Sequence, residues 1–219
     1  MSEEFKKRLV TSIFLITLLI LMYIYSYILI VSLIVIAIIT WVEFYAIISK
    51  IFSSEIFKDR FLRIIFKAIS LTYLSTIVFI IIKYQTSYLS VFITYSVLVA
   101  IASDIGGLVI GKTLKGRKLT SISPKKTISG SLGAFIFSLL LIPFFIDSLL
   151  INSFLLLFFI TLVISLASQT GDLFISLLKR KAKVKDTSDI LPGHGGFLDR
   201  IDGIIFAIPV GLILFSFLK

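Results

Sequence analysis

Residues 9–48 read LVTSIFLITLLILMYIYSYILIVSLIVIAIITWVEFYAII and contain a single charged residue, Glu43. A helix needs about 20 apolar residues to cross a bilayer, so this stretch is long enough for two crossings. We expect two helices that meet near the Tyr-Ser-Tyr triplet at residues 25–27. The charged residues 1–8 precede the first apolar run without a small-residue cleavage site, so we expect the first span to be retained.

The composition of the whole chain also requires a membrane. Of the 219 residues 58% are apolar, 21 are Phe, and the mean hydropathy is +1.10. A soluble domain of this size cannot enclose so much apolar surface. The formal charge is +10, but Lys and Arg cluster between apolar runs and do not alternate with aromatic residues, which disfavours a nucleic-acid partner. The chain has no Cys, which excludes a disulfide framework and a thiolate metal site.

Further apolar runs follow the first pair, and they lie at residues 61–82, 88–110, 131–146, 149–178 and 203–218. The sequence therefore predicts an all-α, polytopic transmembrane helix bundle of about seven spans. Nearly all Lys and Arg residues fall in alternate connections, whereas the other connections hold only Lys83 and Lys219. Because basic loops stay in the cytoplasm, we expect these connections, and any polar active site built from them, to face that side. No repeat or linker divides the chain, which predicts one integral membrane domain, 1–219.

Three carboxylates interrupt the apolar spans. Asp104 and Asp172 lie near the basic ends of the fourth and sixth spans, where a carboxylate in lipid would cost roughly 2.5 to 3.5 kcal/mol. Such a residue faces a functional cavity, caps a helix or pairs with a loop Lys, and these interpretations stay open for both. Glu43 lies deeper in its span with no motif around it, so we predict a structural role for it.

A second polar segment, ISPKKT at residues 122–127, follows the Gly106–Gly107 pair of the fourth span. Small residues permit close helix packing or the close approach of a ligand. Pro124, two Lys residues and Thr127 place hydrogen-bond donors at a loop-to-helix junction, an arrangement suited to phosphate groups. Basic loops beside membranes also contact anionic headgroups, and this alternative stays open for the segment taken alone.

The densest polar run is SLLKRKAKVKDTSDILPGHGGFLDRID, residues 176–202, which we call the signature stretch. Its glycines free the backbone, its cations can neutralise phosphate charge, and its carboxylates together with Asp172 can bind a hard divalent cation. His194, the sole histidine, is either a hydrogen-bonding loop residue or a general base. It has no His or Cys partner for a zinc site. The residues concerned are Gly193, Gly195, Gly196, Lys179, Arg180, Lys185, Arg200, Asp186, Asp199 and Asp202.

The signature stretch resembles that of the phosphatidate cytidylyltransferases, or CDP-diacylglycerol synthases. Their pattern is Ser, Lys-Arg, Lys-Asp, Pro-x-His-Gly-Gly and Asp-Arg-x-Asp, and it is filled completely from Ser176 to Asp202. The Ser103–Asp104 pair and residues 122–127 resemble the family's second block, and Trp41 with Glu43 resembles its N-terminal Trp-Glu. The chain departs from the family at Gly107, Leu108, Ser129 and Ile175, and the family's acid missing at Ile175 leaves one fewer carboxylate near Asp172.

The resemblance implies transfer of CMP from CTP to phosphatidic acid, which yields CDP-diacylglycerol and pyrophosphate, with the catalytic half at residues 88–219. It implies Mg²⁺ held by Asp172, Ser176 and Asp199, and a second, monovalent cation is left open. It implies catalytic roles for Asp172, Asp199, Lys179, Arg200 and His194. The expected substrate-binding residues are Ser123, Lys125, Lys126, Thr127, Arg180, Lys185, Gly195, Gly196, Asp104, Asp186 and Asp202.

The expected setting is a bacterial plasma membrane, with the protein crossing it several times and the active site on the cytoplasmic side. The lipid bilayer, CTP and phosphatidic acid are the expected partners, nucleic acid is not, and a homodimer is left open. Two other functions are weighed. A CTP-dependent kinase of polyprenols or other lipids would share membrane, nucleotide and metal. A small multi-pass transporter is disfavoured because the chain lacks paired inverted repeats and midplane polar residues.

Overall fold

The structure is a computed structural model that describes residues 3–149, 151 and 153–217. Throughout these residues the regular elements are helices, and the only β pairings are two isolated bridges, Lys118 with Thr127 and Leu191 with Gly195. This confirms the all-α prediction. The chain packs into two compact units, one from residues 1–85 and 178–201, the other from residues 86–177 and 202–219. Each unit is described separately, and the single domain expected over 1–219 stays a prediction.

The first unit contains α1 (Glu3–Ile24), α2 (Ser26–Ile51), α3 (Phe57–Tyr84) and the short α8 (Leu198–Ile201). Tyr25 alone separates α1 from α2 and has an extended backbone, which confirms the turn predicted near residues 25–27.

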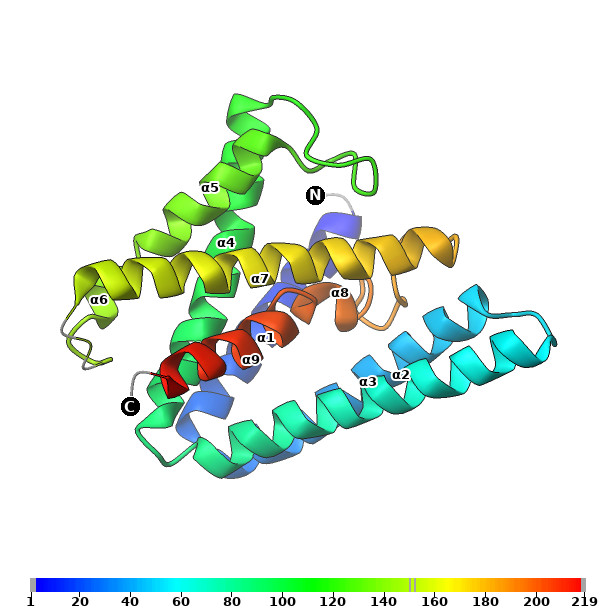
Figure 1. The fold of residues 1–219 in the computed structure, drawn as a ribbon, viewed down its shortest axis with the longest axis horizontal. Coiled ribbons are helices and arrows are strands. Elements are labelled where there is room, and N and C mark those ends of the chain that lie inside the picture. The colour runs from blue at the N-terminus through cyan, green and yellow to red at the C-terminus, as the bar shows by residue number, and fades with distance from the viewer. Residues whose placement is uncertain (1–2, 150, 152, 218–219) are drawn as a thin grey trace. The chain divides into compact units, whose positions relative to one another are not determined.

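Helices α2 and α3 form an antiparallel hairpin (Figure 1). The indole N–H of Trp41 on α2 donates to the carbonyl of Lys67 on α3 at 3.2 Å. Phe52, just after α2, stacks on Phe66 with ring centroids 5.6 Å apart. These contacts hold the two helices together near the end at which the chain turns from α2 into α3.

The second unit contains α4 (Leu89–Leu114), α5 (Ile128–Leu139), α6 (Ile142–Phe145), most of α7 (Phe154–Lys181) and α9 (Ile204–Ser216). Its core lies between α4, α7 and α9, where Val99, Leu157, Ile164 and Ala207 have no exposed surface. Because lipid tails are as apolar as these side chains, close van der Waals packing stabilises such a contact in a membrane protein. This unit therefore has a dry centre of its own.

Glycines let α4 and α5 approach at backbone distance, as the adjacent ribbons in Figure 1 show. A Cβ added to Gly106 would overlap the carbonyl oxygen of Gly133, and one added to Gly107 would lie 3.6 Å from that of Gly130. Of the two uses expected for the Gly106–Gly107 pair, the structure shows close helix packing.

Five helical segments of the described residues are long and apolar enough to cross a membrane: α2, α3, α4, residues 128–145 and α7. The apolar part of α1, Leu9–Ile24, is shorter, and α9 has 13 residues. The helices coincide with the seven apolar runs of the sequence, but the count of seven crossings stays a prediction. Helices α3 and α7 extend past the predicted runs and include basic residues, because long cationic side chains can bury their stems and keep their charge in water.

Candidate functional site

Much of the signature stretch lies in the first unit, where Glu43 of α2 holds it. Glu43 is only 2% exposed, and both of its carboxylate oxygens accept hydrogen bonds. Oε1 accepts from the Ser188 hydroxyl at 2.6 Å and from Phe197 N–H at 3.0 Å. Oε2 accepts from the Thr187 hydroxyl at 2.9 Å and from Leu198 N–H at 2.8 Å. The structural role predicted for Glu43 is confirmed.

Asp199 is the second carboxylate around which the stretch folds, and its side chain is 6% exposed. Lys179 Nζ donates to Oδ1 at 2.5 Å, while Thr187 N–H and Gly196 N–H donate to Oδ2 at 2.8 and 3.2 Å. Burial acts to raise the pKa of Asp199, but the hydrogen bonds from Lys179, Thr187 and Gly196 outweigh it and hold the pKa below its usual value. Asp199 is therefore an ionised, firmly positioned carboxylate.

Three glycines allow the chain to turn around these carboxylates. Gly193 and Gly195 have φ angles of +75° and +80°, which favour glycine, and the Leu191–Gly195 pairing closes the turn at 2.8 Å. A Cβ on Gly196 would overlap the Thr187 hydroxyl and lie 2.6 to 2.7 Å from the Glu43 oxygens. The predicted freeing of the backbone is thus required here to bring main-chain N–H groups against carboxylates.

Arg200 and His194 interact within the same turn. The Nε and Nη2 atoms of Arg200 donate to the carbonyl oxygen of His194 at 3.0 and 2.5 Å. The imidazole Nε2 lies 3.5 Å from the Ser12 hydroxyl of α1, and Nδ1 has no hydrogen-bond partner among the described residues. The contacts of His194 match the loop-residue interpretation, and its predicted catalytic role stays a prediction.

A second polar cluster lies in the second unit, around Asp172 on α7. Lys126 forms an ion pair with the Asp172 carboxylate, and the Ser176 hydroxyl, one helical turn further on, donates to Oδ1 at 3.3 Å. Asp202, just before α9, lies near these groups. Burial, followed by the carboxylates of Asp172 and Asp104, raises the pKa of Asp202 to about 8. The structure thus brings three predicted carboxylates into one electrostatic neighbourhood.

The segment at residues 122–127 ends at a helix, as its sequence predicts. The Thr127 hydroxyl accepts from Gly130 N–H at 3.0 Å and caps α5, and the backbone pairs Leu119 with Lys126. The cap satisfies an otherwise unpaired donor of the first turn, so Thr127 has a structural function besides its predicted contact with substrate. Lys125 is exposed and Ser123 is half-buried.

The remaining predicted residues lie at the surface. Asp104, Arg180, Lys185 and Asp186 are exposed, in α4, in α7 and in the loop after α7. The prediction missed Thr187 and Ser188 as organising residues. Their hydroxyls, next to the Lys-Asp pair of the signature stretch, were the available signal, but their acceptor, Glu43, lies about 145 residues earlier in the chain.

The expected Mg²⁺ can be tested against these donors. No group of three acidic or histidine side chains among the described residues could hold a metal ion. Mg²⁺ is commonly bound by one or two carboxylates together with substrate phosphates and water, so such a group is not required. In the second unit the oxygen atoms of Asp172 and Ser176 are of the type that this hard cation prefers, and in the first unit the same holds for the carboxylate of Asp199.

Several curated proteins resemble part of this chain. The phosphatidate cytidylyltransferase of Bacillus subtilis (strain 168) is 41% identical over 133 residues, 60% of this chain and 49% of that protein. Those of Rickettsia typhi and Staphylococcus haemolyticus are 44% identical over 115 residues and 43% over 127, covering 49% and 56% of this chain and 50% and 48% of theirs. The chain therefore spans about half the length of these relatives.

The sequence profile of the cytidylyltransferase family covers far more of the chain, from residue 1 to residue 218. The matched residues include α1 to α3 as well as the signature stretch. Glu43, whose hydrogen bonds hold that stretch, therefore lies inside the match. The chain belongs to the cytidylyltransferase family.

Proposed function

We propose that this protein transfers CMP from CTP to phosphatidic acid, giving CDP-diacylglycerol and pyrophosphate. The observation that carries the proposal is the complete signature stretch, folded around Glu43 and Asp199, in a chain whose relatives are named phosphatidate cytidylyltransferase. The lipid phosphate oxygen forms a bond to the α-phosphorus of CTP, and the bond from that phosphorus to the bridging oxygen of pyrophosphate breaks.

The residues of this chain supply charge and position, with little call for a strong base, because the attacking oxygen is already anionic. Lys126 and Lys179, which pair with Asp172 and Asp199 in the structure, are the cations we assign to phosphate oxygens. Lys125, Arg180 and Arg200 extend this set. Once the two lysines bind phosphate, the carboxylates of Asp172 and Asp199 are free of their ion pairs. Together with Ser176 they would hold Mg²⁺, which when bound neutralises phosphate charge.

The proposed location is a bacterial plasma membrane with the basic connections in the cytoplasm, where CTP is dissolved. The asymmetric placement of Lys and Arg supports this orientation. The apolar helices α2 to α4 and α7 support a multi-pass protein that takes its acceptor from the bilayer.

The experiment follows both products at once. Purified protein is incubated with CTP labelled in the cytidine, phosphatidic acid and Mg²⁺, and we expect label in the lipid phase and an equal amount of released pyrophosphate. Release of CDP with unlabelled lipid would identify a lipid kinase. Absence of nucleotide turnover with phosphatidic acid and, in a parallel reaction, with a polyprenol would contradict both enzymes and favour the transporter, provided that a melting curve shows the preparation to be folded.

A further inference from the structure

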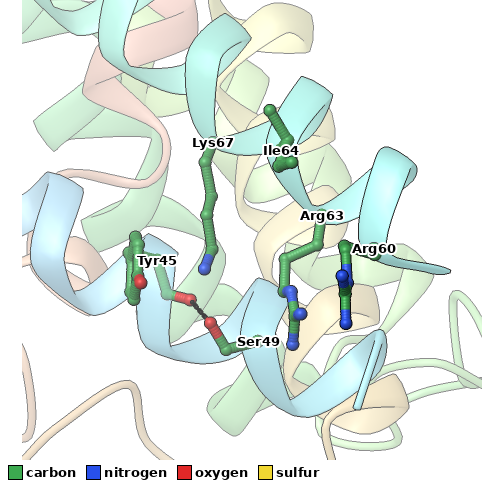
Figure 2. Close-up of a pocket in the computed structure, with 6 residues that line it drawn as sticks. All are labelled: Tyr45, Ser49, Arg60, Arg63, Ile64 and Lys67. Atoms are coloured by element: carbon green, nitrogen blue, oxygen red, sulfur yellow. Dashed lines mark hydrogen bonds between the residues drawn. The ribbon is translucent and has the colours of Figure 1, made fainter. Parts of the chain in front are cut away.

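A basic pocket lies between α2 and α3 in the first unit, away from the signature stretch. It has a volume of about 540 Å³ and is lined by Tyr45, Ser49, Arg60, Arg63, Ile64 and Lys67. Figure 2 shows the cationic side chains reaching from α3 toward α2, where Tyr45 and Ser49 lie. Tyr45 is two residues from Glu43, about 200° around the helix, so α2 turns one face to the signature stretch and another to this pocket.

The cations of the pocket outnumber the carboxylates near them, of which Glu55 interacts electrostatically with both Arg60 and Arg63. Arg60 pairs with Glu55 at 2.8 Å, and both side chains are largely exposed at the rim. Among the residues that the structure describes, no carboxylate lies within 4 Å of Arg63 or Lys67, both of which are half-buried. The Lys67 ammonium instead lies 3.2 Å from the centroid of the Tyr45 ring. A cation–π contact holds an ammonium in place without neutralising it, which leaves the charge for an anion.

The position of the cations indicates a ligand that reaches into the bilayer. Arg60, Arg63 and Lys67 follow one face of α3 over about 10 Å, at the end where the helix enters its apolar run. Phe61 and Ile64, 54% and 61% exposed, present apolar surface beside them. A soluble phosphate would gain nothing from these side chains, whereas a phospholipid would place its phosphate on the cations and its acyl chains along them.

We propose that the α2–α3 pocket binds the phosphate of an anionic phospholipid, as a site separate from the residues assigned to the transfer reaction. The proposal goes beyond the proposed function and does not depend on it. Phosphatidylglycerol is a suitable probe because it is an anionic phosphodiester and is not the proposed acceptor.

Trp41, the single tryptophan of the chain, reports on this pocket because its indole donates to the Lys67 carbonyl. The full-length protein is placed in phosphatidylcholine nanodiscs with a small fraction of lipid whose acyl chains are brominated, and quenching of Trp41 fluorescence is measured. Brominated phosphatidylglycerol should quench at a lower fraction than brominated phosphatidylcholine. Equal quenching by the two lipids in the wild-type protein would overturn the proposal without any variant.

A pair of matched variants tests the residues. Each cation near an anionic surface contributes about fivefold in binding, so Arg63→Gln with Lys67→Gln should reduce the preference for phosphatidylglycerol by about 25-fold. Lys50→Gln with Lys58→Gln removes the same charge from neighbouring residues that do not line the pocket, and should keep most of the preference. An equal loss of the phosphatidylglycerol preference in both double variants would show general attraction between a basic surface and an anionic lipid, and would contradict a specific pocket.

A third arm distinguishes the source of the phosphate. Millimolar inorganic phosphate added to the same nanodiscs should leave the selective quenching unchanged, because it lacks the acyl chains that contact Phe61 and Ile64. Displacement of the lipid by inorganic phosphate would assign the pocket to a soluble anion and contradict the lipid proposal. The Arg63→Lys variant, which keeps the charge, should retain the preference.

Discussion

At the scale of single residues, the buried carboxylates of Glu43 and Asp199 have different hydrogen-bond partners and different roles. Glu43 accepts hydrogen bonds only from hydroxyls and main-chain N–H groups. Asp199 accepts from main-chain N–H groups on one oxygen, which also lies 3.0 Å from the Thr187 hydroxyl, and from the Lys179 ammonium on the other. The first arrangement fixes a loop, whereas the second also keeps a cation and an anion that a phosphate ligand could separate.

Replacing Glu43 by Gln should loosen the signature stretch. Each Glu43 oxygen accepts one main-chain N–H, from Phe197 or from Leu198, so an amide NH₂ must oppose one of these donors. Leaving a buried donor unsatisfied costs about 1 to 3 kcal/mol. We expect a lower melting temperature and faster hydrogen exchange at Phe197 and Leu198. Glu55→Gln, an exposed control, should change neither, and normal exchange in Glu43→Gln would contradict the assigned role.

We expect substitutions of the three proposed metal ligands to reduce turnover to different extents. Asp172→Asn and Asp199→Asn should each reduce turnover by about 100-fold or more, as loss of a group that stabilises transition-state charge does. Ser176→Ala, which removes a neutral ligand, should cost less. Activity is measured at several Mg²⁺ concentrations in purified, folded protein. Near-normal turnover of Asp199→Asn with unchanged Mg²⁺ dependence would place the metal elsewhere.

At the scale of helices, the α4–α5 contact depends on glycines that differ in the space around them. Gly106 and Gly107 are neighbours in sequence, yet a Cβ on Gly106 would overlap Gly133 and lie 2.6 Å from Phe137 Cβ, while one on Gly107 meets nothing closer than 3.6 Å. The sequence shows only that both are small. Which of them faces the partner helix follows from the rotation of α4.

Alanine substitution should therefore separate the two positions. Gly106→Ala forces the helices apart and should destabilise the second unit by about 1 to 3 kcal/mol, the usual cost of overpacking. Gly107→Ala should be neutral or slightly stabilising, because alanine favours helix more than glycine does. Thermal melting of the two purified variants in the same detergent compares them. Equal melting temperatures would show that α4 and α5 do not pack at these glycines.

At the scale of the whole molecule, the orientation in the membrane can be tested on a chain without cysteines. Single cysteines at Ser121 and Asp189, both exposed in basic connections, should react with a membrane-impermeant thiol reagent only from the cytoplasmic side. A cysteine at the exposed Ser26, the first residue of α2, should react only from the opposite side. Labelling of Ser26→Cys and Ser121→Cys from the same side would contradict the seven-span topology.

The sequence by itself determined the helical class, the membrane environment and the residues of the signature stretch. Hydropathy is a local property of about 20 residues, so apolar runs such as residues 9–48 show where helices form without knowledge of their partners. The residue types of a phosphate-binding stretch are also visible without a structure, because charge and glycine content can be read directly.

Only the tertiary structure decided which of these residues meet. Glu43 lies 144 to 155 residues before its partners, and Lys126 reaches Asp172 from the loop before another helix. Hydropathy and motif spacing do not contain such pairings, because they depend on how each helix is rotated and which side chains fill its grooves. The same rotation turns Tyr45 toward Lys67 and creates the α2–α3 pocket, which no motif of the sequence indicated.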